Sequence, residues 1–195
     1  MLLVVALTMS MLPTAFATDS GATFQDVGVD HWSYSYVEQS VALGLFQGID
    51  ENTFDPAGTM TRGMFMTVLN RMSGEIVDND TPTGFEDVAP GRYFTGAVAW
   101  AVSAGITKGT TETTFEPNAT VTRGQVVTFL HRMAGEPVVT EANPFVDVKD
   151  GSFCCDAVIW AVGEGVTNGY TATTFQPNTG CTRGQIVTFL YRYMG

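Results

Sequence analysis

Three arginines occupy the positions in this sequence that are most informative for chemistry. The chain has only nine Lys and Arg residues, and three of the arginines stand in Thr-Arg-Gly motifs, namely Arg62, Arg123 and Arg183. Each motif predicts a helix start, where the helix dipole disfavours a cation. A guanidinium beside free backbone N–H groups is instead suited to an anion, and arginine can hold a planar carboxylate with two hydrogen bonds. The pattern therefore predicts three carboxylate-binding arginines.

An aspartate precedes each of these arginines along the chain. It lies in a Phe-x-Asp-Val motif, and the three aspartates are Asp26, Asp87 and Asp147. As an alternative to ligand binding, each arginine could form an ion pair with the aspartate of a neighbouring unit. The two roles are compatible if the aspartate orients the arginine toward a ligand.

Two further positions accompany the charged pair. An aromatic residue follows each aspartate by six residues, at Trp32, Tyr93 and Phe153. Such a ring could stack on a sugar, or it could pack in the core. A glycine recurs in the loop that follows, at Gly48, Gly109 and Gly169. Two tryptophans within apolar helical stripes, Trp100 and Trp160, are expected in the core. A second set of arginines, Arg71, Arg132 and Arg192, falls near helix ends and is expected to be structural.

All of these motifs belong to a unit that occurs three times. The copies span residues 24–74, 85–135 and 145–195, and the equivalent motifs are 61 and then 60 residues apart. Apolar residues at helical spacing predict two helices with a loop between them in each unit. A capping box is predicted for Thr122 with Gln125 and for Thr182 with Gln185. In the first unit Met64 stands in place of the glutamine, so only the threonine half of the box remains. Because two short helices bury too little surface alone, we expect one all-α body with approximate threefold symmetry.

Composition excludes several functional classes. The net charge is -11, the pI is about 4.3 and hydrophobic residues make up 45% of 195 residues. This acidity argues against nucleic acid and anionic membranes as partners, and the hydrophobic content argues against disorder. The sequence has no H-E-x-x-H, G-x-S-x-G or glycine-rich phosphate loop. We therefore expect no catalytic residues, no cofactor and no metal site.

Residues 1–17 are typical of a signal peptide. They carry no charge and contain an apolar run that ends in Ala15-Phe16-Ala17. This pattern predicts cleavage after Ala17 and a secreted chain, and the alternative is an uncleaved anchor. No other stretch is long and apolar enough to span a bilayer.

The three cysteines all lie in the third unit. They are Cys154, Cys155 and Cys181. A secreted protein favours oxidation, so we expect one disulfide to Cys181, with Cys154 rather than Cys155 as its partner. The three thiols lack a convincing fourth ligand for a metal ion.

The joint pattern of these motifs resembles the S-layer homology (SLH) family over residues 24–195. The resemblance implies a pseudo-threefold bundle of helix-loop-helix units at the cell surface. It also implies non-covalent attachment to the cell wall through a secondary wall polysaccharide, often carrying pyruvate ketals, bound in grooves between units. The family's key positions fall on the arginines, aspartates, aromatic residues and loop glycines named above. The family motif often ends in glutamate, where this chain has Met64, Gln125 and Gln185. The alternative function is a protein–protein interaction or surface-layer assembly module.

Overall fold

The computed structural model describes residues 23–195, so the predicted signal peptide lies outside the described residues. This part of the chain contains six helices and no sheet, which confirms the all-α prediction. The helices are α1 (Tyr34–Ala42), α2 (Arg62–Ser73), α3 (Thr95–Ser103), α4 (Arg123–Met133), α5 (Cys155–Gly163) and α6 (Arg183–Met194). None of them is long and apolar enough to cross a membrane.

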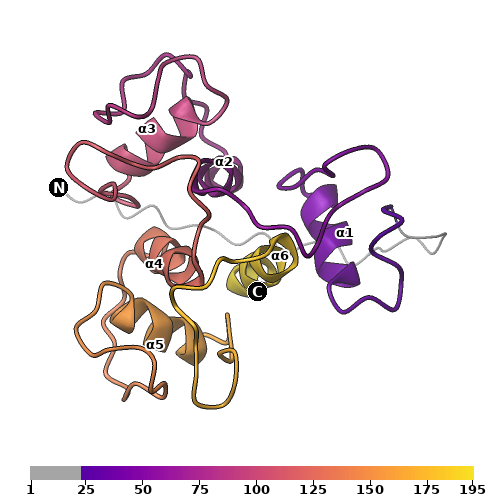
Figure 1. Ribbon diagram of the computed structural model, residues 1–195, viewed down its shortest axis with the longest axis vertical. Helices are drawn as coiled ribbons and strands as arrows, with labels where there is room; N and C mark the ends of the chain where they lie inside the picture. The colour runs from indigo at the N-terminus through magenta and orange to yellow at the C-terminus, as the bar shows by residue number, and fades with distance from the viewer. Residues whose placement is uncertain (1–22) are drawn as a thin grey trace.

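The helices are arranged with approximate threefold symmetry (Figure 1). The second helix of each repeat, α2, α4 or α6, lies near the centre, and the first helices lie outside them. Each outer helix packs on the central helix of the preceding repeat, so that α3 contacts α2 and α5 contacts α4. The first repeat closes the ring because α1 contacts α6. Each lobe of the body therefore combines helices from two repeats.

Short backbone bridges join the three repeats at the centre. They pair Thr59 with Thr182, Thr61 with Thr120, and Thr122 with Gly180. Around them lies one apolar core in which Phe54, Phe115 and Phe175 are fully buried. Trp100 and Trp160 are also buried, as predicted. All three repeats thus contribute to the hub, in which the start of each central helix lies against its neighbour.

The threonines of the Thr-Arg-Gly motifs cap the central helices as predicted. Thr122 and Gln125 form a complete capping box at α4, and Thr182 and Gln185 form one at α6. At α2 the hydroxyl of Thr61 accepts from the N–H of Met64, which is half of the box. Each cap satisfies backbone donors that would otherwise have no partner in the first helical turn.

Removing the α4 cap should destabilise the protein measurably. We expect Thr122→Ala to lower the free energy of unfolding by about 1–2 kcal/mol, because a buried helix start loses its acceptor. Gln125→Met copies the residue of the first repeat and removes only the reciprocal bond, so it should cost less than Thr122→Ala. Urea denaturation of both variants checks this order. Equal losses would show that the threonine cap does not dominate.

Candidate functional site: grooves between the repeats

The motif arginines are buried and cross from one repeat to the next. Arg62 donates from Nε to the carbonyl oxygen of Phe115 at 2.8 Å. Arg123 and Arg183 make the same bond to Phe175 at 2.9 Å and to Phe54 at 2.7 Å. Their exposed fractions are only 2%, 3% and 5%, respectively. Each guanidinium is therefore fixed by the Phe-x-Pro segment of the following repeat, and the segment of the first repeat fixes Arg183 of the third.

Each guanidinium also lies between aromatic rings. The guanidinium carbon of Arg62 is 4.5 Å from the ring centre of Phe115 and 5.6 Å from that of Phe129. The rings of Phe175 and Phe189 enclose Arg123 in the same way. Cation–π contacts of this kind hold the charge in place without using its hydrogen-bond donors. The rings therefore fix each guanidinium and leave its terminal nitrogens free to bind other groups.

The motif aspartates do not bind the arginines directly. Each one accepts two backbone N–H groups in the Phe-x-Pro segment of its own repeat, as Asp87 does from Phe115 at 2.8 Å and from Glu116 at 2.6 Å. Asp26 and Asp147 make the equivalent pairs of bonds. Within residues 23–195 no ion pair joins a motif aspartate to a motif arginine. The alternative ion pair is thus not formed there, and the link is indirect: the aspartate shapes the segment that holds the arginine.

The three arginines differ in how their terminal nitrogens are satisfied. Nη2 of Arg183 donates to the carbonyl oxygen of Gln47 at 2.7 Å. Nη2 of Arg62 and Nη2 of Arg123 are buried and have no hydrogen-bond partner. Burial lowers the pKa of Arg62, and the charges of Glu116 and Asp87 offset this lowering only in part, but arginine stays protonated in proteins. A buried, charged donor without a partner is costly, and an anion would satisfy it.

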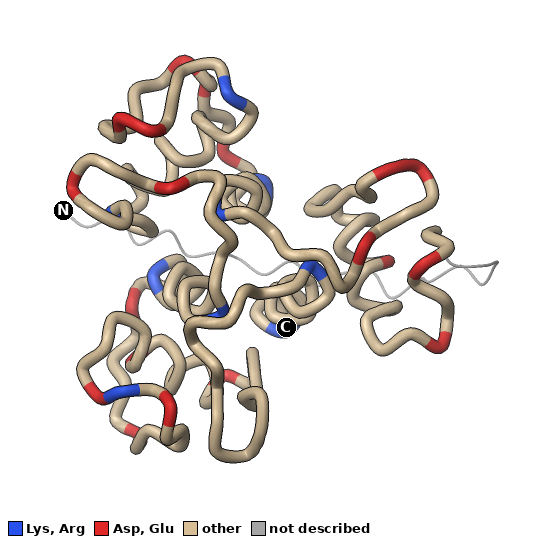
Figure 2. The backbone as a smooth tube through the Cα atoms, in the orientation of Figure 1, with Lys and Arg blue, Asp and Glu red and all other residues tan. Residues whose placement is uncertain are grey.

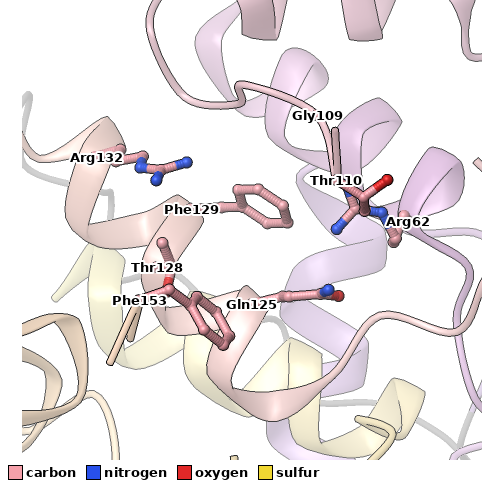
Figure 3. Close-up of a pocket in the computed structure, with 8 residues that line it drawn as sticks. All are labelled: Arg62, Gly109, Thr110, Gln125, Thr128, Phe129, Arg132 and Phe153. Atoms are coloured by element: carbon pink, nitrogen blue, oxygen red, sulfur yellow. The ribbon is translucent and has the colours of Figure 1, made fainter. Parts of the chain in front are cut away.

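Arg62 lines a groove that is built from all three repeats. The groove has a volume of about 310 Å³ and follows α4 (Figure 3). Arg62 comes from the first repeat, Gly109 and Thr110 from the loop of the second, and Phe153 from the third. The remaining lining residues lie on α4: Gln125, Thr128, Phe129 and Arg132. We call this the α4 groove.

A smaller cavity of about 160 Å³ lies at the equivalent place beside α2, and we call it the α2 groove. It brings together Arg183, the loop around Gly48, and Tyr93. The central helix α2 has Val68 where α4 has Phe129, so it offers no ring to the guanidinium. The ring of Phe46 takes this role, because its centre lies 5.8 Å from the guanidinium carbon of Arg183. The carbonyl oxygen of Gln47 already accepts a hydrogen bond from Nη2 of Arg183. The α2 groove therefore has fewer free hydrogen-bond donors for an anion than the α4 groove.

The remaining motif residues are Trp32, Arg123 and Gly169. Trp32 packs close to Gly184 at the start of α6, and Arg123 follows Thr122 at the hub. The ring of Tyr170, next to Gly169, lies 6.0 Å from the guanidinium carbon of Arg123. Because the second repeat has the smaller Thr110 at this position, Arg62 is covered by fewer aromatic rings than Arg123.

The predicted aromatic positions lie on the surface and not in the core. Trp32 and Tyr93 are 58% exposed and Phe153 is 61% exposed. Tyr93 and Phe153 border the α2 and α4 grooves. Exposed rings at a groove edge can stack on a ligand, whereas core rings cannot. The core-packing alternative for these three residues was therefore wrong.

The loop glycine is required by the tightness of its turn. Gly109 has a φ of +81°, and a Cβ there would lie 2.5 Å from the ring of Phe85 and from the carbonyl oxygen of Thr111. Gly48 and Gly169 are equally crowded by their neighbours. The glycine thus lets the loop backbone approach the groove beside the arginine.

Sequence reasoning missed the part of the α4 groove that the helix itself supplies. Gln125, Thr128, Phe129 and Arg132 follow one another at i, i+3, i+4 and i+7, which places them on one face of α4. That spacing was visible in the sequence. Arg132 was expected to be purely structural, but it lines the groove and also donates from Nη1 to the carbonyl oxygen of Ile106 at 3.0 Å. Arg71 makes the equivalent bond to Leu45 and lines the α2 groove.

Charge is distributed unevenly over the molecule. Figure 2 shows that many of the Lys and Arg residues lie on the central helices, whereas Asp and Glu lie mostly in the outer loops. The charged residues that line the α4 and α2 grooves are all arginines. An anionic ligand would be attracted to these grooves and repelled by the outer surface.

The cysteines are not joined in the structure. Cys154, Cys155 and Cys181, all within residues 23–195, are free and buried, so the expected disulfide between Cys154 and Cys181 is not formed there. Cys154 precedes α5 and lies near Ser152 and Gly124, whereas Cys181 lies in the core before α6. Burial raises the pKa of the Cys181 thiol to about 12, although Arg123 acts to lower it.

Thiol labelling tests this arrangement. In the native protein at pH 8, iodoacetamide should react very slowly with Cys181, because its raised pKa keeps the buried thiol protonated. After unfolding without reductant, all three cysteines should be labelled. Mass spectrometry counts the modified thiols. A single labelled thiol in the unfolded protein would show instead that two cysteines form a disulfide.

Comparison with known proteins identifies relatives of the whole repeat array. A family model described as S-layer homology domain matches residues 23–63, 84–127 and 144–187. The chain is 30% identical to an endoglucanase of Bacillus sp. (strain KSM-635), over 95% of this chain and 21% of that protein. It is 28% identical to a cellulosome-anchoring protein of Acetivibrio thermocellus, over 58% of this chain and 26% of that protein. It is 30% identical to a surface layer protein of Brevibacillus choshinensis, over 75% of this chain and 13% of that protein. The chain thus spans about a quarter or less of the length of these relatives.

Proposed function

Because the chain belongs to the S-layer homology family, a family of cell-wall anchoring modules, we propose that it binds an anionic wall polysaccharide in the grooves between its repeats. The ligand would be a secondary wall polysaccharide that carries a carboxylate, such as a pyruvate ketal. The protein would be secreted and held at the cell wall without a covalent bond. It would act as a non-catalytic module, because the enzymes among its relatives are several times longer and match it over a minor part of their length.

One observation carries this proposal. The buried Arg62 guanidinium lines the α4 groove and leaves Nη2 without a partner. A carboxylate oxygen placed in the groove would accept a charge-assisted hydrogen bond from Nη2. Gln125 and Thr128 could bind sugar hydroxyls, and the exposed ring of Phe153 could stack on a sugar face.

The architecture suits a polymer better than a small ligand. Similar arginine sites occur three times around one body, so one polysaccharide strand or several neighbouring strands can occupy more than one groove. Linked sites can raise the apparent affinity about 100-fold over a single site. Weak individual grooves would therefore suffice for stable attachment to a wall.

Cosedimentation with purified cell-wall sacculi tests the proposed function. We expect the protein to pellet with intact sacculi and to stay in solution with sacculi whose secondary polysaccharide has been removed. Equal binding to both preparations would indicate peptidoglycan as the ligand. No binding to either would contradict wall anchoring and favour a protein–protein module.

A further inference from the structure

The lobes of the body differ in what covers the start of the outer helix. In the lobe of α2 and α3, the linker of residues 75–84 crosses the start of α3. The side-chain oxygen of Asn79 accepts the N–H of Gly96 at 3.0 Å, and a Cβ on Gly96 would clash with the carbonyl oxygen of Val77. The side chain of Val77 packs against the core. The chain that precedes the second repeat therefore covers the start of its outer helix.

A side chain on the central helix holds each linker. Nδ2 of Asn70 on α2 donates to the carbonyl oxygen of Glu75 at 3.0 Å. His131 takes the same place on α4, where its Nε2 lies 2.9 Å from the carbonyl oxygen of Pro137. In the same linker, the side chain of Val139 packs against the core. Two lobes thus share one arrangement, in which the central helix binds the backbone of a segment that runs to the outer helix.

The third lobe lacks such a linker within residues 23–195, because α6 is the last helix and α1 the first (Figure 1). Tyr191 stands where the other central helices have Asn70 and His131. Its ring centre lies 5.0 Å from that of Tyr36 on α1. Tyr36 is partly exposed, whereas the other outer helices have a buried alanine at this position. We call the start of α1 with these two tyrosines the open seat.

The described chain enters this lobe beside the open seat. The N–H of Thr23 donates to Oε1 of Glu38 at 2.9 Å, and the hydroxyl of Thr23 donates to Oε2 at 2.6 Å. Glu38 stands on α1 where α3 and α5 have the buried Ala99 and Ile159. A carboxylate here binds polar chain, which the apolar side chains of the other helices cannot do. These two bonds hold the residue from which the preceding segment begins.

The spacing along the chain indicates which segment corresponds to the linkers. Asn79 precedes Gly96, its partner at the start of α3, by 17 residues. The same spacing before Ser35, the equivalent of Gly96 on α1, leads to Thr18. Thr18 is the first residue after the predicted cleavage site. Residues 18–22 lie outside the described residues, and five extended residues span about 17 Å. That length exceeds the single helical turn that separates Glu38 from Ser35.

Cleavage after Ala17 would leave an ammonium group on Thr18. Residues 23–42, which include α1, contain three acidic residues and no Lys or Arg, so the field of this segment favours a cation. The ring faces of Tyr36 and Tyr191 also attract a cation. In the uncleaved chain the same nitrogen is an uncharged amide and has neither attraction.

We propose that residues 18–22 of the cleaved chain occupy the open seat, with the Thr18 ammonium against the pair of Tyr36 and Tyr191. The mature N-terminus would then take the part that a linker takes in the other two lobes. Removal of the signal peptide would complete the third lobe. This inference rests on the predicted cleavage after Ala17 and is independent of the polysaccharide.

Hydrogen exchange on three forms of the protein tests the inference. One form begins at Thr18, the second is the same chain with an acetylated N-terminus, and the third begins at Thr23. We expect the amides of α1 to exchange about tenfold more slowly in the first form than in the third. Acetylation removes the charge and keeps the residues, so the second form should lose most of this protection. The amides of α3 and α5 are the internal control and should not change.

A substitution in the open seat locates the contact. In Tyr36→Leu, the forms that begin at Thr18 and at Thr23 should protect α1 equally, because the ammonium has lost a ring face. Equal protection of α1 in the unsubstituted forms that begin at Thr18 and at Thr23 would overturn the proposal. Full protection in the acetylated form would overturn the role of the ammonium. Equal changes in all outer helices would also contradict docking at the open seat, since they would reflect general stability.

Discussion

Arg62→Lys should weaken binding to intact cell walls about 10- to 100-fold, whereas Arg183→Lys should change it far less. Lysine keeps the positive charge but cannot place a second donor into the groove. The loss corresponds to about 1.5–3 kcal/mol for a hydrogen bond between charged groups. Nη2 of Arg183 is already bound to the Gln47 carbonyl, so the same substitution there removes a structural bond and no ligand contact. Quantitative cosedimentation with sacculi measures both variants.

The two variants control for each other structurally. Each loses one Nε bond to a phenylalanine carbonyl and a position between two aromatic rings. Arg183→Lys also loses the Nη2 bond to the Gln47 carbonyl, so its free energy of unfolding should fall at least as far as that of Arg62→Lys, which urea denaturation verifies. If both variants stay folded and lose wall binding equally, the unpartnered nitrogen of Arg62 has no special role.

Asp87→Ala should lower the free energy of unfolding by about 2–4 kcal/mol. The carboxylate of Asp87 accepts two short hydrogen bonds from the backbone of Phe115 and Glu116, and Glu116 has the unfavourable φ of +59°. Removing the acceptor leaves two backbone donors unpaired and releases the turn that positions the Phe115 carbonyl for Arg62. The midpoint of urea denaturation reports the loss.

Glu112→Ala is the matched control for Asp87→Ala. Glu112 is an exposed carboxylate in the same repeat, so its removal changes the net charge equally. It should alter stability by less than about 0.5 kcal/mol. A comparable loss in both variants would mean that net charge, and not the two backbone hydrogen bonds, explains the effect of Asp87.

Local features of this protein could be predicted from sequence because their causes are local. The Thr122–Gln125 capping box depends on residues three apart, and the apolar stripe of α4 depends on helical spacing. Repetition made the motif arginines recognisable as a set. The indirect role of the aspartates was not predicted, because it depends on backbone groups that lie 28 and 29 residues away.

The composition of the grooves depends on packing between repeats and was not predicted. Nothing in the sequence of one unit shows that α5 packs on α4 and so brings Phe153 into the same groove as Arg62. The difference between Arg62 and Arg183 is equally hidden, since it arises from the position of one loop carbonyl. The expected disulfide relied on the redox environment, which does not determine where two sulfur atoms lie.

A crystal structure of the protein with a pyruvate-ketal disaccharide would test the central claim most directly. We predict that the ligand carboxylate lies within hydrogen-bond distance of Nη2 of Arg62 in the α4 groove, with a sugar ring against Phe153. A ligand bound at the outer loops, or a carboxylate held by other residues while the Arg62 nitrogen stays without a partner, would contradict it.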